Sequence, residues 1–308
     1  MPKASPGIWH DGPLRLVPLM PAGFDEIIVL DWSAAATPRQ GKDSIWIGQA
    51  GKAPVNPATR DAAMALLHAR IDSARAMGRR VLLGADFPFA YPAGFARALT
   101  GQSGALAIWD WLLTHVQDGP DNANNRFQLA DRINAGLPGT GPFWGRPSGL
   151  ALPHLPARGT QRHDMPFAEK RRVEARETGL QPVWKLFTTG SVGSQALLGI
   201  ARLAAMRRRL GPRCVVWPFE PLEGADVVLA EVWPSLLAPQ VKAVEKAYPC
   251  RDAAQVDLLA RALRALKCDD WERLLSPAED GLEEEGWILG AGMAGVLQQA
   301  LARAMPAG

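Results

Sequence analysis

Three short apolar runs, each with a carboxylate at or near its end, constrain the fold of this chain more than any other feature. The runs lead into Asp31, Asp86 and Glu231 and consist mainly of Val, Ile, Leu and Ala. Continuous runs of this kind predict strands that are buried on both faces of a sheet. A charged group at such a place is costly unless it lies at a sheet edge that faces water or a metal ion. The sequence therefore predicts a buried sheet with acidic groups along one edge.

Strand and helix patterns alternate along the chain. A short strand after the first apolar run suggests a hairpin with a long loop, and apolar residues at helical spacing predict the helices. The predicted strands cover residues 26–31, 44–48, 80–86, 214–218 and 227–234, and the predicted helices cover residues 59–77, 103–116, 193–210 and 252–266. This order predicts the α/β class, with a mixed sheet and helices on both faces.

The predicted elements divide the chain into a core and three other parts. Residues 1–23 are rich in proline and glycine, and we expect an N-terminal arm there. Residues 118–183 hold many glycines and prolines and are too long for an ordinary loop, so we expect an insertion or lid over the carboxyl rim of the sheet. The core is expected to span residues 24–117 and 184–268, followed by a helical C-terminal tail over residues 269–308.

Composition and charge exclude several classes of protein. With 47% hydrophobic and 21% charged residues, the 308-residue chain is not expected to be disordered. No run of about 18 apolar residues predicts a membrane span, and no targeting segment is evident, so we expect a cytoplasmic protein. The three cysteines are too scattered for a zinc site or a disulfide framework. A net charge of +3 neither requires nor excludes a nucleic-acid partner.

Two glycine-rich segments match nucleotide-binding loops only in part. Residues 136–141 have the glycine spacing of a phosphate-binding loop, but Pro142 and Phe143 stand where a lysine and a hydroxyl residue are needed. Residues 290–295 match the pattern G-x-G-x-x-G, but no acid follows that could hold a ribose. We therefore expect no bound nucleotide cofactor at either segment.

The acids are the residues most able to carry chemistry. Asp31, Asp86 and Glu231 end strands, and Asp252 opens a predicted helix. The carboxyl ends of parallel strands converge on one rim, which is where open α/β sheets bind ligands. Two carboxylates ~4 Å apart repel each other by about 4 kcal/mol at an effective dielectric of roughly 20, and Mg²⁺ or Mn²⁺ would relieve that repulsion. The alternatives are that the strand-end acids are simply solvated and that Asp252 is a helix N-cap.

Cationic and hydroxyl side chains are candidates for binding a phosphate group. Lys185 and Arg126 could contact phosphate oxygens, while Ser191 and Ser194 lie at the start of a predicted helix whose amino end could do the same. The insertion carries further arginines, but they alternate with glutamates. A solvated, ion-paired helix is therefore an alternative to a nucleic-acid surface.

The order of these elements resembles that of the ribonuclease-H-like superfamily. A strand with Asp31, a hairpin strand, a helix, a strand with Asp86, a later strand with Glu231 and a final helix with Asp252 follow one another in that order. The chain is also similar to an uncharacterised family of predicted bacterial nucleases, some of which are automatically labelled with molybdopterin-guanine-dinucleotide synthesis. The segments that carry this similarity are residues 31–33, 86–88, 231–234 and 252–256.

The resemblance implies a ribonuclease-H-like fold with a two-metal site, in which Asp31, Asp86, Glu231 and Asp252 hold Mg²⁺ or Mn²⁺ for phosphodiester hydrolysis. Resolvases of this fold carry a second acid three residues further along the final helix, where this chain has Gln255, a weaker ligand. We expect a divalent-metal-dependent nuclease or phosphodiesterase that acts on nucleic acid or a nucleotide. The alternatives are a nucleotide- or cofactor-handling enzyme, such as a phosphotransferase or a molybdopterin-related enzyme, and a non-catalytic scaffold with the same fold.

Overall fold

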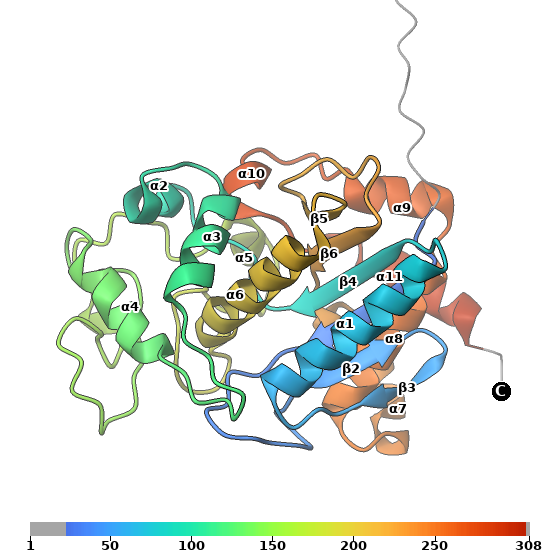
Figure 1. The fold of residues 1–308 in the computed structure, drawn as a ribbon, viewed down its shortest axis with the longest axis horizontal. Coiled ribbons are helices and arrows are strands. Elements are labelled where there is room, and N and C mark those ends of the chain that lie inside the picture. The colour runs from blue at the N-terminus through green and yellow to red at the C-terminus, as the bar shows by residue number, and fades with distance from the viewer. Residues whose placement is uncertain (1–22, 306–308) are drawn as a thin grey trace, which may run out of the picture.

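The structure is a computed structural model that describes residues 23–305, so the predicted N-terminal arm lies almost wholly outside the described residues. Its centre is one six-stranded sheet with the strand order β3-β2-β1-β4-β6-β5 (Figure 1). The strands are β1 (Glu26–Asp31), β2 (Trp46–Gln49), β3 (Lys52–Val55), β4 (Val81–Asp86), β5 (Cys214–Trp217) and β6 (Val227–Glu231).

The register of the sheet places two aspartates side by side. β1 pairs in parallel with β4, and Asp31 lies opposite Asp86. β6 continues the parallel part next to β4, with Glu231 opposite Ala85. β2 runs antiparallel to β1, and β3 runs antiparallel to β2. The sheet is therefore mixed, as predicted, and the acid-bearing ends of β1, β4 and β6 share one edge.

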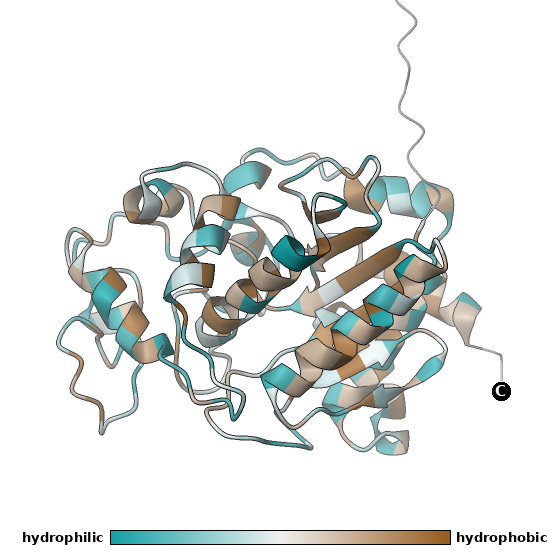
Figure 2. Ribbon diagram, in the orientation of Figure 1, coloured by the Kyte–Doolittle hydropathy of each residue, from teal (hydrophilic) through white to brown (hydrophobic). Residues whose placement is uncertain are grey.

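Helices cover both faces of the sheet (Figure 1). They are α1 (Arg60–Ala76), α2 (Phe95–Thr100), α3 (Ala105–His115), α4 (Arg126–Ala135), α5 (Arg172–Arg176), α6 (Val192–Leu210), α7 (Ala238–Val244), α8 (Arg251–Arg264), α9 (Cys268–Leu275), α10 (Leu282–Glu285) and α11 (Ala294–Ala304). The α1, α3 and α6 helices pack with Ile28 and Leu30 of β1, whereas α8, α9 and α11 pack with Ile27 and Val29 on the opposite face. Figure 2 shows mainly hydrophobic residues in the central strands β4 and β6, and both hydrophobic and hydrophilic residues in the surrounding helices.

The predicted helices of the core are present, and their ends differ from the prediction by no more than two residues. Thr59 caps α1 by accepting a hydrogen bond from the Ala62 amide at 3.1 Å. The last apolar run forms a strand only as far as Glu231, because Pro234 begins a short 3₁₀ helix soon afterwards. β3 was not indicated by the sequence, since three of its four residues are exposed and leave no apolar run.

The segment predicted as an insertion, residues 118–183, contains a helix that its sequence pattern did not indicate, α4. Figure 1 shows α4 and the loops around it beyond the carboxyl ends of the strands. Phe127 and Ile133 of α4 belong to the same apolar cluster as α1, α3 and α6. Phe143 packs edge-on against Trp184 at a centroid distance of 5.3 Å. This segment therefore shares the core of one face of the sheet, and a lid motion stays a prediction.

The described helices do not include a membrane span. Within residues 23–305, none of them combines enough length with enough apolar character to cross a bilayer.

Gly48 of β2 allows α8 to pack closely on the sheet. A Cβ atom at Gly48 would lie 2.4 Å from the carbonyl oxygen of Val256 in α8, closer than any real contact. We expect Gly48→Ala to push α8 away and to lower the free energy of unfolding by about 1–3 kcal/mol, as measured by urea denaturation. Gly295→Ala in α11 is the matched control, because nothing lies within 4 Å of its added Cβ. It should be neutral or stabilise by up to ~1 kcal/mol, and equal effects of the two changes would contradict the close packing of α8.

Candidate functional site

An open cleft lies at the carboxyl ends of β1 and β4 and reaches the start of α8. Its volume is about 760 Å³. Residues 32–44, which follow β1, and residues 186–195, which lead into α6, both contribute to its lining. The lining includes the three acids Asp31, Asp86 and Asp252. We call this the carboxylate cleft. Its other polar lining residues include Arg39, Lys42, Asp43, Arg126, Ser191, Ser194, Gln195 and Gln255.

The fold brings Asp31, Asp86 and Asp252 together from three different elements. Asp31 and Asp86 end neighbouring parallel strands in register. Asp252 is the second residue of α8, and its carboxylate accepts a hydrogen bond from the Asp43 amide at 2.7 Å. The sequence did not single out Asp43, because an acid in a polar loop carries no pattern of its own. Asp257 is buried instead against Tyr248, away from the carboxylate cleft, as its spacing along the helix indicates.

The three acids resist ionisation in this setting. Burial raises the pKa of Asp31 well above its usual value, and the charges of Asp86, Asp252 and Asp43 add to the effect. Burial likewise raises the pKa of Asp86 from 3.8 to about 7, with contributions from Glu231 and Asp252. The pKa of Asp252 is also raised, mainly by burial. A cation in the carboxylate cleft would favour the ionised forms and so would be bound in competition with protons.

Glu231, the fourth predicted acid, lies beside the carboxylate cleft and is bound by an arginine. Its two carboxylate oxygens accept hydrogen bonds from the Arg171 guanidinium at 2.6 and 2.8 Å, and one of them also accepts from the Phe89 amide at 2.9 Å. Arg171 additionally contacts Glu174 at 2.7 Å, and all three charged side chains are buried. The predicted role of Glu231 as a metal ligand stays a prediction. No local pattern indicates its pairing with Arg171, which is 60 residues away in the chain.

Arg126 brings a positive charge to the carboxylate cleft. Its Nε donates to the Ser194 hydroxyl at 3.0 Å and its Nη1 donates to the Asn124 side-chain oxygen at 2.7 Å. Both partners are neutral, and within residues 23–305 no carboxylate forms an ion pair with Arg126. Burial lowers the pKa of Arg126 to about 10, so the side chain stays protonated at neutral pH. A partly buried guanidinium with neutral partners is suited to bind an anion.

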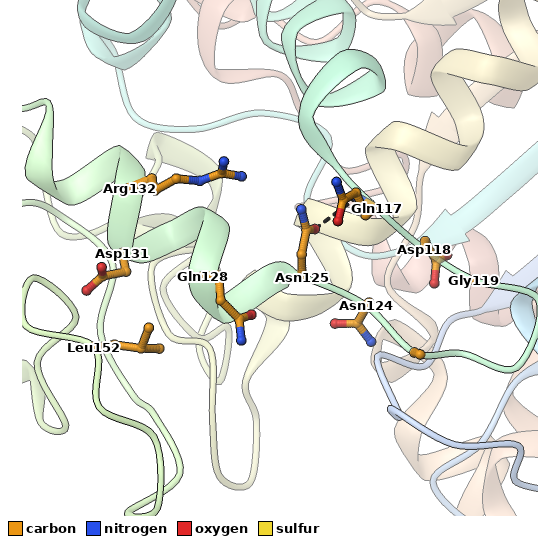
Figure 3. A pocket seen from close by; sticks show the side chains of 10 residues that line it. Gln117, Asp118, Gly119, Asn124, Asn125, Gln128, Asp131, Arg132 and Leu152 are labelled. Atoms are coloured by element: carbon orange, nitrogen blue, oxygen red, sulfur yellow. Dashed lines mark hydrogen bonds between the residues drawn. The ribbon is translucent and has the colours of Figure 1, made fainter.

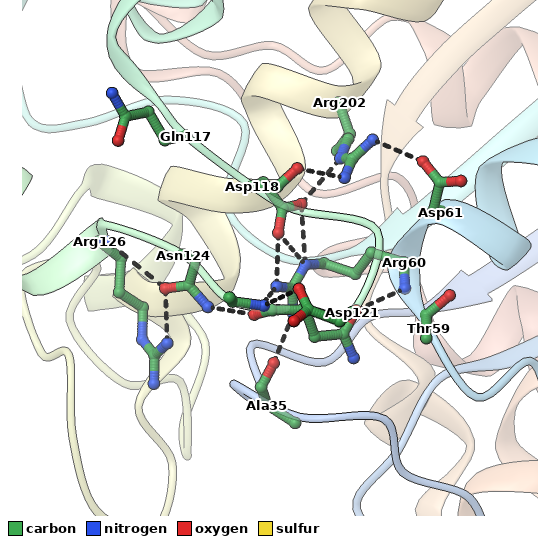
Figure 4. Close-up of polar contacts among 12 residues, drawn as sticks. Ala35, Thr59, Arg60, Asp61, Gln117, Asp118, Asp121, Asn124, Arg126 and Arg202 are labelled. Carbon is green, nitrogen blue, oxygen red and sulfur yellow. Dashed lines mark hydrogen bonds and ion pairs between the residues drawn. The ribbon is translucent and has the colours of Figure 1, made fainter.

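A buried polar network positions both Arg126 and the loop after β1 (Figure 4). Arg60 is fully buried and donates to Asp118 at 2.6–3.0 Å, to the Asn122 carbonyl at 2.8 Å and to the Ala35 carbonyl at 2.7 Å. Asn124, which holds Arg126, donates to the same Asn122 carbonyl at 2.8 Å. Arg60 therefore connects the two segments that carry cleft residues. Sequence reasoning missed it, because the first residue of an amphipathic helix is ordinarily exposed.

Three of the four predicted phosphate-binding residues line the carboxylate cleft: Arg126, Ser191 and Ser194. The Ser194 hydroxyl donates to the Leu186 carbonyl at 2.6 Å while it accepts from Arg126, so its main role is to hold that guanidinium. Lys185 is not part of the lining. Its Nζ donates to the Thr189 carbonyl at 2.7 Å and so stabilises the segment 186–195, which does line the cleft.

A second hollow lies beside α4 (Figure 3). It has a volume of about 660 Å³, and its ten lining residues include four amide side chains, the cation Arg132 and two acids. The amides are Gln117, Asn124, Asn125 and Gln128. Its two acids already have partners, since Asp118 is paired with Arg60 and Asp131 accepts from the His154 amide at 2.7 Å. The carboxylate cleft, where Asp31 and Asp86 are adjacent in register, is therefore the stronger candidate for chemistry.

Comparison of the chain with models of protein families, with curated proteins and with solved structures found no match. The geometry of the site is therefore the basis for inferring its function.

Proposed function

We propose that this protein is a divalent-metal-dependent phosphodiesterase, and that its natural activity is that of a nuclease. The observation that carries this proposal is the composition of the carboxylate cleft. It combines Asp31 and Asp86, adjacent in register, with the Arg126 guanidinium. The carboxylates suit a hard cation and the guanidinium suits a phosphate, so both groups that phosphodiester hydrolysis requires have a binding partner.

The arrangement of the sheet is consistent with a ribonuclease-H-like fold, which we propose on that basis. An antiparallel β1–β2–β3 unit is followed by the parallel strand β4, and acids end β1, β4 and β6. Asp252 lies on α8, which packs against β1 and β2. The last two strands do not follow chain order, which goes beyond what the resemblance implies. β5 precedes β6 in the chain, yet β6 pairs with β4, and β5 lies at the edge of the sheet, where it pairs with β6.

The donor set fits Mg²⁺ or Mn²⁺ by its chemistry. Within residues 23–305, no group of three or more His, Cys, Asp or Glu side chains is already arranged to enclose a metal ion. Mg²⁺ does not require such an enclosure, since it is commonly held by one or two carboxylates together with water and substrate phosphate. Asp31 and Asp86 would hold the ion, and Asp252 would complete the site. The bound ion would neutralise negative charge and make a water molecule more acidic.

The chain's own residues have distinct tasks in this proposal. Arg126 binds the non-bridging phosphate oxygens, and Ser194 and Asn124 hold its guanidinium in place. Asp252 is fixed by the Asp43 amide, which orients its carboxylate within the carboxylate cleft. Such positioning lowers the entropic part of the reaction barrier before any bond changes.

Mn²⁺ binding measured by calorimetry as a function of pH tests this proposal. The pKa of Asp86 is raised to about 7, so Mn²⁺ must displace a proton from Asp86 below about pH 7. The pKa of Asp31 is also raised, which adds to the competition between Mn²⁺ and protons. We expect binding to be at least about tenfold tighter at pH 8 than at pH 6, with proton release that is detected by changing the buffer. Hydrolysis of methyl p-nitrophenyl phosphate, a simple diester, should require the added Mn²⁺.

Two results would contradict the proposal. Absence of Mn²⁺ binding at pH 8 together with absence of diester hydrolysis would favour a non-catalytic scaffold. Saturable ATP binding without diester hydrolysis would favour a phosphotransferase.

A further inference from the structure

The carboxylate cleft carries an exposed aromatic ring beside its cation. Phe187 is 40% exposed and lines the cleft. The other large hydrophobic residues exposed within residues 23–305 are Val55, Met77 and Met305, which are aliphatic and do not line it. Single exposed apolar side chains are common on protein surfaces, but Phe187 is exposed within the cleft that Arg126 also lines.

The ring of Phe187 is supported by groups that also support Arg126. Phe187 packs against Phe127 with a centroid distance of 6.2 Å and an interplanar angle of 74°. The Arg126 guanidinium lies 4.3 Å from the centre of the same Phe127 ring. A phosphate-binding cation and an exposed aromatic ring therefore share one support at the edge of the carboxylate cleft.

The loop that follows Phe187 is held in a strained conformation. Thr188 has a φ of +78°, which is unfavourable for a β-branched residue. The Thr188 carbonyl accepts a hydrogen bond from the Ser191 amide at 3.2 Å, and Lys185 holds the Thr189 carbonyl. Strain of this kind persists where the surroundings fix a loop in one shape. The backbone that carries Phe187 is thus fixed next to the carboxylate cleft.

We propose that Phe187 is a stacking surface for an unpaired nucleobase whose phosphate group binds Arg126 in the carboxylate cleft. This inference rests on the proposed function and specifies its substrate as single-stranded. A cleft of about 760 Å³ has the size of sites that hold one small ligand, so it admits about one nucleotide. A base inside a duplex already stacks on both faces, so within a strand the ring is accessible to an unpaired base.

One nucleotide at the end of a strand and a free nucleotide ester present the same chemistry to this site. Three substrates separate the possibilities. Methyl p-nitrophenyl phosphate has no base, thymidine 5′-(p-nitrophenyl phosphate) adds one base, and a twelve-residue oligothymidylate adds a strand. The same oligomer annealed to its complement tests whether the base must be unpaired.

The decisive variants of the full-length chain are Phe187→Ala and Phe187→Tyr, with Met77→Ala as the control for loss of an exposed apolar side chain. Stacking on an aromatic ring predicts that Phe187→Ala lowers kcat/KM about 5- to 100-fold for the thymidine ester and the oligomer. Its effect on methyl p-nitrophenyl phosphate should be smaller. Because both esters carry the same p-nitrophenyl leaving group, the ratio of their kcat/KM values isolates the contribution of the base. Phe187→Tyr and Met77→Ala should retain wild-type values on all substrates.

The outcomes distinguish this inference from the proposed function. An equal loss on all three substrates would show that Phe187 only shapes the site, and an unchanged kcat/KM on the thymidine ester would show that it does not stack; either result overturns the inference. Equal cleavage of the duplex and the single strand would also overturn it. In each case, Mn²⁺-dependent hydrolysis of methyl p-nitrophenyl phosphate by the wild-type chain would leave the proposed function standing.

Discussion

Replacing Asp86 by asparagine should abolish Mn²⁺ binding and lower diester hydrolysis by about 10³-fold or more, yet stabilise the metal-free protein at pH 8. The pKa of Asp86 rises from 3.8 to about 7 in the folded chain, mainly through burial. Between about pH 4 and pH 7 the folded chain therefore keeps a proton that the unfolded chain has lost. The stability of the metal-free protein must fall as the pH rises through this range and stay lower above it.

The size of this effect follows from the same shift. A difference of about three pKa units corresponds to roughly 4 kcal/mol, and this is a ceiling because the carboxylate cleft admits solvent. We expect Asp86→Asn to raise the free energy of unfolding at pH 8 by about 1–3 kcal/mol and to have little effect at pH 5, where the wild-type carboxyl keeps its proton. Urea denaturation at both pH values in the presence of a chelator measures this difference.

A matched control lies at the opposite end of β1. Glu26 begins the strand that Asp31 ends, and its carboxylate is bonded to Gln49 and Arg79, far along the strand from the carboxylate cleft. Glu26→Gln should leave Mn²⁺ binding unchanged and should not stabilise the protein. If Asp86→Asn binds Mn²⁺ with wild-type affinity, the carboxylate cleft is not the metal site. If it destabilises the metal-free protein at pH 8, the raised pKa of Asp86 is wrong.

The strands and main helices could be predicted because each depends on a local pattern. The apolar runs before Asp31 and Asp86 mark central strands, and parallel pairing brings their ends together without further information. The position of Asp252 was predicted in the same way, from the start of an apolar-periodic helix. Short-range rules place each of the three acids at a strand end or a helix start, which is why these positions could be predicted. The pairing of β1 with β4 and the packing of α8 on β1 then bring the acids to one cleft.

The parts that could not be predicted depend on side chains that meet across long stretches of sequence. Arg60 and Arg171 are fully buried arginines, and no pattern of neighbours distinguishes them from the exposed arginines of other helices. Their partners, Asp118 and Glu231, are about 60 residues away. Such pairs are found only when the chain is folded, which is why the pairing of Glu231 was missed although the residue itself was noticed.

Arg171→Met should be the most destabilising single change among the charged residues around the carboxylate cleft. It would leave Glu231 and Glu174 buried without their cation, at 3% and 1% side-chain exposure. Removing one partner of a buried ion pair typically costs about 3–5 kcal/mol, which urea denaturation would detect. Arg172→Met is the matched control, because among the described residues the Arg172 guanidinium donates only to the exposed Asp280 carbonyl. Its effect should stay below about 1 kcal/mol.

The double variant Arg171→Met/Glu231→Gln determines what Glu231 does. A neutral glutamine can still accept the hydrogen bond from the Phe89 amide and removes one of the two unpaired charges, while Glu174 keeps the other. The double variant should therefore recover part of the stability that Arg171→Met loses. If Glu231 pairs with the Arg171 guanidinium and does not bind the metal ion, Mn²⁺ affinity in the double variant should stay within about tenfold of wild type. This corresponds to a change below about 1.4 kcal/mol. A larger loss of Mn²⁺ affinity in a folded double variant would instead show that Glu231 is a metal ligand. The ion pair between Glu231 and Arg171 would then have to break before the site binds the ion.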